Sequence, residues 1–143
     1  MKNKVETVKI LYHLPHYVPN EERITKESVL MKAEMINDSK LVNVCINILE
    51  NAENPMDKVH SNPNYNFIIL HLSEQARLRQ HIYQTTDLLR QEGSNAILVA
   101  ESSIYPCGKE EILEHFDEYS DRIAHGHVLE DLLKKYGFMK REQ

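Results

Sequence analysis

Arg79 is the side chain in this sequence that most suggests a binding site, because it interrupts an apolar pattern. Read as one helix, the stretch Phe67–Arg90 places on one face a series spaced alternately four and three residues apart: Ile68, Leu72, Gln75, Arg79, Ile82, Thr86 and Leu89. A guanidinium on a face that meets the core is costly unless an anion pairs with it. That anion is either a carboxylate of this chain, such as Glu74 or a residue on another element, or the acidic group of a ligand.

Three more residues complete the predicted ligand-binding set. His71 flanks the Arg79 face, where it could hydrogen-bond a ligand or titrate near neutral pH. The predicted ligand-binding residues are Arg79, His71, Gln75 and Tyr83. The alternative is that these are ordinary packed side chains, with Arg79 in an intramolecular ion pair.

Other motifs predict neither a metal site nor catalysis. The sequence has no HExxH and no Cys-x-x-Cys spacing, so no zinc site is expected. It also lacks G-x-S-x-G and a glycine-rich phosphate loop, and we therefore do not predict an enzyme. The acidic residues that begin at Glu110 and Glu111 are interpreted as a solvated helix face. Cys45 lies in an apolar run and is predicted to be a small core residue.

Composition places the chain among globular proteins. Its 143 residues suit one domain, 1–143, and 41% hydrophobic with 27% charged residues exclude a disordered chain. The net charge of −5 and the lack of a basic stripe argue against nucleic acid as a partner. We expect no membrane span, since no apolar run is long enough. With two cysteines and no export signal in MKNKVETVK, a cytoplasmic location is expected.

The expected elements favour an all-α fold. Only four glycines are present and the Asn-Gly, Asp-Gly and Gly-Gly hairpin pairs are absent. Helices are predicted for 26–37, for a central buried segment at 39–52, for 67–90 ending at Gly93, and for one kinked or two separate helices over 109–136 ending at Gly137. The interval 53–66 is predicted to be a surface loop or a short extra turn of helix. The rival interpretation is an α/β fold with a small sheet formed by 5–14, 67–73 and 96–102.

The overall organisation, including the segments YHLPHYVPNEER and SKLVNVCINILENAENP, resembles the non-haem globin-like sensor domains of sporulating bacilli. Those domains occur in sporulation histidine kinases and as stand-alone inhibitory relatives. The resemblance implies a globin-like helical dimer without haem, and an apolar tunnel in which a fatty acid carboxylate meets an arginine. It also implies that the protein modulates a sporulation kinase pathway by binding that signal.

Two functions from different classes therefore compete. The first is a sensor that binds a fatty acid or similar apolar carboxylate, with Arg79 as the anchor and a homodimer through the helices in 109–136. The apolar residues of 128–136 could equally pack on the domain's own core. The second is a small α/β interaction or regulatory protein without a ligand cavity. No cofactor is expected in either case, apart from a possible bound fatty acid or small anion.

Overall fold

The structure is an alternation of strands and helices around a parallel sheet, not a helical bundle. This computed structural model describes residues 6–14, 26–50, 54–73, 75–102, 108–120, 123 and 126–139. Its elements are β1 (Thr7–Leu14), α1 (Lys26–Asp38), β2 (Asn43–Glu50), α2 (Pro55–Ser61), β3 (Phe67–His71), α3 (Ala76–Gln91), β4 (Ile97–Glu101), α4 (Lys109–His115), β5 (Glu118–Ser120) and α5 (Val128–Lys135). The all-α, globin-like prediction is wrong, and the α/β alternative is the fold observed.

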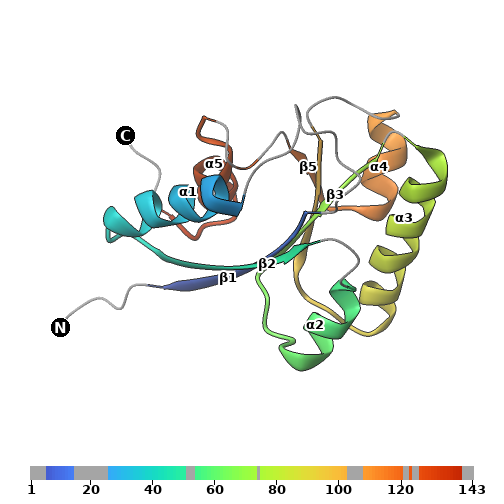
Figure 1. Cartoon of the computed structure of the whole chain (residues 1–143), viewed down its shortest axis with the longest axis horizontal. Helices are drawn as coiled ribbons and strands as arrows, with labels where there is room; N and C mark the ends of the chain where they lie inside the picture. Colours follow the sequence, from blue (N-terminus) through green and yellow to red (C-terminus); the bar gives the residue numbers. More distant parts are fainter. Residues whose placement is uncertain are drawn as a thin grey trace.

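The five strands in the described part of the chain are all parallel and lie in the order β2-β1-β3-β4-β5. This is the flavodoxin-like order of doubly wound sheets. β1 lies between β2 and β3, so the chain first builds the sheet to one side of β1 and then to the other. Figure 1 shows α1 and α5 on one face of the sheet and α2, α3 and α4 on the opposite face.

Two hydrophobic clusters, one on each face, hold these layers together. Side chains at alternate positions of β1 divide between them: Val8, Ile10 and Tyr12 pack toward α1 and α5, whereas Leu11 packs toward α2, α3 and α4. In β3 the first four residues are all buried because helices cover both faces. That double burial is why the Phe67–Leu70 run shows no strand-like alternation in the sequence.

Two segments predicted to be helical contain strands in the structure. The expected helix over 67–90 is in fact β3 followed by α3, and the expected buried helix over 39–52 is β2, a strand at the side of the sheet. Cys45 on β2 is exposed, so its prediction as a core residue is wrong. The helix predicted over 26–37 is confirmed by α1, and the interval 53–66 contains the short helix α2.

The segment 109–136 is not a helical pair. It forms α4, β5 and α5, and α5 buries its leucines against the sheet of its own chain: Leu129, Leu132 and Leu133. This is the core-packing alternative for these residues, and the homodimer through them stays a prediction. The predicted helix end at Gly137 is confirmed, since this glycine has a φ of 83° and the next amide, that of Phe138, donates to the carbonyl oxygen of Leu133.

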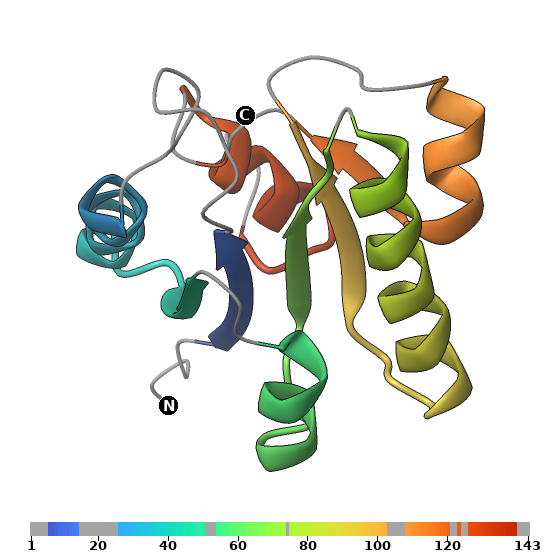
Figure 2. The same cartoon turned by 45° about the vertical axis from the view of Figure 1, so that its right-hand side comes forward.

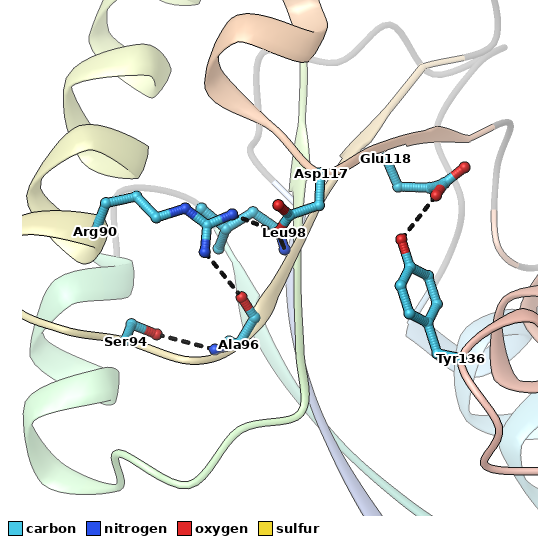
Figure 3. Close-up of polar contacts among 7 residues, drawn as sticks. All are labelled: Arg90, Ser94, Ala96, Leu98, Asp117, Glu118 and Tyr136. Carbon is cyan, nitrogen blue, oxygen red and sulfur yellow. Dashed lines mark hydrogen bonds and ion pairs between the residues drawn. The ribbon is translucent and has the colours of Figure 1, made fainter.

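Polar contacts tie the amino ends of β4 and β5 to α3 and to the segment after α5 (Figure 3). The guanidinium of Arg90 forms an ion pair with Asp117 and donates to the carbonyl oxygen of Ala96 at 3.3 Å. The Asp117 carboxylate also accepts from the backbone N–H of Leu98 at 2.8 Å. On the other face, the Tyr136 hydroxyl donates to Glu118 at 2.8 Å.

Burial, aided by the hydrogen bond to Glu118 and the charge of that carboxylate, raises the pKa of Tyr136 from 10.0 to about 12. The folded state therefore holds this proton more tightly than the unfolded state. The stability that results is complete below about pH 10 and is lost as pH rises toward about 12. We expect the free energy of unfolding of the wild-type protein to fall more steeply over this interval than that of Tyr136→Phe. Urea unfolding at several alkaline pH values measures the difference, and parallel curves would contradict it.

Candidate ligand site at the carboxyl end of the sheet

Buried polar side chains gather where the parallel strands end. Among the described residues six polar side chains are buried, and two of these, Thr85 and Thr86, bond to carbonyl oxygens of their own helix. The other four lie at or just beyond the ends of β1, β3 and β4: His13, Ser73, Glu101 and Ser102. Burying polar groups costs free energy. Their concentration at the carboxyl end of the sheet therefore makes this end the candidate ligand site.

Glu101 fixes the centre of this region. Its side chain is 2% exposed, and the Tyr12 hydroxyl donates to its Oε1 at 2.7 Å. Its Oε2 accepts from the backbone N–H of Ile123 at 3.2 Å. One buried carboxylate thus joins β1, β4 and the chain beyond β5. In the sheet register Glu101 is also the neighbour of His71, which ends β3.

Ser73 organises the passage from β3 into α3. Its hydroxyl oxygen accepts from the backbone N–H of Gln75 at 3.0 Å, and Gln75 is the residue that precedes the first turn of α3. The Ser73 carbonyl oxygen accepts from Arg79 at 3.2 Å. Arg79 is thereby held at the carboxyl end of the sheet.

Arg79 pairs with a carboxylate from another helix. Its Nε lies 3.3 Å from an oxygen of Glu111 on α4, and its side chain is 11% exposed. The same Glu111 oxygen accepts from the Tyr83 hydroxyl at 2.9 Å. The Tyr83 ring in turn stacks on the ring of His115, with centroids 4.0 Å apart. This cluster fastens α3 to α4, which Figure 2 shows side by side, and balances the guanidinium charge within the chain.

The structure divides the predicted ligand-binding set. Arg79 and Tyr83 meet at Glu111, on the face covered by α2, α3 and α4. Gln75 is exposed beside them. His71 is partly buried on β3 and is the sheet neighbour of Glu101. Tyr12, the hydrogen-bond partner of Glu101, packs on the other face of the sheet, toward α1 and α5. His71, Gln75 and Arg79 lie near the carboxyl end of the sheet, Tyr83 lies in the middle of α3, and the four residues do not converge on one another.

Sequence reasoning missed His13, Ser73, Glu101 and Ser102. A signal was present, because polar residues follow each of three apolar runs: ILYH, FIILHLS and ILVAESS. In a parallel sheet the ends of such runs come together. Reading the runs as pieces of helix concealed this.

Other features of the described residues bear on the class of site. No group of three or more His, Cys, Asp or Glu side chains is placed there to hold a metal ion. No helix in the described part of the chain combines the length and apolar character needed to cross a bilayer. A cavity of about 760 Å³ lies at the opposite, amino end of β3 and β4, between residues such as Tyr65, Glu92 and Phe138.

Comparisons with protein-family models, curated proteins and solved structures find no match to this chain.

Proposed function

We propose that this chain is a small α/β regulatory domain that acts by binding, and that its ligand occupies the carboxyl end of the sheet between β1, β3 and β4. The observation that carries the proposal is the gathering of four of the six described buried polar side chains at this end. In open α/β sheets, ligands bind outside the carboxyl ends of the strands where the strand order reverses. Here that point lies between β1 and β3.

The side chains at this end favour a ligand with several hydrogen-bonding groups over a strongly charged one. Imidazole and hydroxyl groups are supplied by His13, Ser73 and Ser102. Both oxygens of Glu101 already accept hydrogen bonds, and Arg79 is paired with Glu111. An apolar carboxylate anchored by Arg79 would have to displace Glu111. The fatty acid sensor therefore has less support than the α/β regulatory alternative, and what we keep from it is regulation by binding.

Native mass spectrometry of freshly purified protein, followed by extraction, identifies a bound small molecule. The extracted compound is then added back to apo protein while the imidazole signals are followed by NMR. We expect signals of His13 and His71 to move. The signal of His60 should stay in place, because His60 lines the cavity at the amino end. A compound that shifts His60 and leaves His13 and His71 unmoved would contradict this site.

A matched pair of serine variants tests the same proposal by affinity. The hydroxyl oxygen of Ser73 accepts from the amide two residues later, and Ser94 makes the equivalent contact with the amide of Ala96 at the amino end of β4. The two variants therefore lose a similar local bond. Ser73→Ala is expected to weaken binding about tenfold through loss of one ligand hydrogen bond, with Ser94→Ala unchanged in calorimetric titration. Equal affinities in both variants would place the ligand elsewhere.

A further inference from the structure

The outer edge of β2 carries an open segment of backbone. Among the described residues β2 is the terminal strand of the sheet and has β1 as its neighbour. Backbone groups of successive residues in a strand point alternately to its two sides. The N–H of Asn43 donates to the carbonyl oxygen of Glu6, toward β1. The N–H and C=O groups of Val44, Ile46, Ile48 and Glu50 consequently point outward.

The side chain of Asn37 already bonds the backbone groups of Val44, the first of these outward-pointing residues. Its side-chain Nδ2 donates to the carbonyl oxygen of Val44 at 3.0 Å, and its Oδ1 accepts from the Val44 N–H at 2.6 Å. The carboxamide at the end of α1 thus makes the two bonds that a neighbouring strand would make. Any added strand must pair beyond Val44.

Ile46 and Ile48 remain open within the described part of the chain, where no outward hydrogen bond to either backbone is found. Their side chains are partly exposed. Leu30 is 42% exposed and, seven residues before Asn37, lies on the same side of α1. The strand NVCINILE contains neither lysine nor proline, the residues that commonly protect a free edge. The edge is therefore short and carries no lysine or proline, and Ile46 and Ile48 provide its open backbone groups.

We infer that this edge is a dimer interface, at which the β2 strands of two copies pair antiparallel about a two-fold axis through Asn47. Ile46 of one copy then lies opposite Ile48 of the other, and each such pair exchanges two hydrogen bonds. A second copy fits better than an unrelated peptide. It presents the same two open residues in reverse order, so the outward groups of Ile46 and Ile48 are satisfied in both chains.

The dimer is expected to be weak and to depend on salt. The paired segment is short, so its buried area falls at the small end of protein interfaces. Each copy carries a net charge of −5, and the repulsion between copies is screened by salt. Sedimentation velocity should therefore show self-association that increases with protein and salt concentration. Ile46→Lys should reduce it while leaving the circular dichroism spectrum unchanged.

Disulfide cross-linking tests the register. With Cys45 and Cys107 replaced by serine, Asn47→Cys places two thiols on the axis, at a non-hydrogen-bonded pair whose Cα atoms are about 4.5 Å apart. Mild oxidation should give a covalent dimer. The control keeps Cys45 as its single cysteine; Cys45 is also exposed but faces Leu49 in this register, roughly 13 Å along the strands from its counterpart.

Two outcomes would overturn the interface. One is a chain that stays monomeric up to millimolar concentration in high salt. The other is cross-linking of the Cys45 control as readily as of Asn47→Cys. The inference is independent of the ligand site, because the β2 edge and the carboxyl end of the sheet share none of these residues.

Discussion

Replacing Glu101 by alanine is expected to lower the free energy of unfolding by about 3 kcal/mol, because it leaves buried donors without their acceptor. The carboxylate accepts from the Tyr12 hydroxyl and from the Ile123 N–H, and all three residues are buried. Urea unfolding followed by circular dichroism measures the change. A variant that unfolds within about 1 kcal/mol of the wild type would contradict this account of Glu101.

A double-mutant cycle separates the hydrogen bond from the loss of side-chain volume. Tyr12→Phe removes one donor and keeps the ring, so it should cost about 1 kcal/mol. In the double variant Tyr12→Phe/Glu101→Ala the orphaned hydroxyl is gone, and the combined loss should be smaller than the sum of the two single losses. Simple additivity would mean that the Tyr12–Glu101 bond does not connect β1 to β4 energetically.

Phe67→Ala is expected to destabilise the protein by about 3–5 kcal/mol, as large-to-small changes of buried aromatic residues do. Phe67 is 1% exposed in β3, and its ring makes edge-to-face contacts with Tyr136 and Phe138, at centroid distances of 5.7 and 5.5 Å. The substitution therefore removes the anchor for the segment that follows α5 as well as part of the core.

Two control variants check the origin of this loss. Phe67→Leu retains most of the buried volume and should cost much less than alanine. Phe138→Ala removes one of the two ring contacts from a partly buried position, and its effect should lie below that of Phe67→Ala. Equal losses for Phe67→Ala and Phe138→Ala would show that the terminal aromatic contact, and not burial in β3, dominates.

The fold was only partly predictable from the sequence, and the missing hairpin signals explain the error. Asn-Gly and Asp-Gly turns join antiparallel strands, whereas parallel strands are joined through helices and need no tight turn. The lack of these pairs therefore argues against tight hairpins and says little about a parallel sheet. The four-and-three spacing from Ile68 to Leu89 was misleading because β3 is buried on both faces and its apolar residues fit either period.

Local patterns predicted that Arg79 needs a negative partner, and the structure provides one within the chain. They could not identify it, because Glu111 is 32 residues away and stands among acidic residues interpreted as a solvated helix face. Its side chain is in fact 42% exposed, which agrees with that interpretation in part. The pairing depends on how α3 and α4 lie against each other, and a single sequence does not reveal this.

The position of β1 in the sheet also governs the order in which the fold can be assembled on the ribosome. β1 is the first of the five described strands to be synthesised, and it occupies an interior place between β2 and β3. Once β2 has emerged, each later strand finds its neighbour already made, since β3 adds to β1, β4 to β3 and β5 to β4. After β2, strands can thus add to the nascent sheet in chain order on one side of β1, and each new strand pairs with a strand that has already been synthesised.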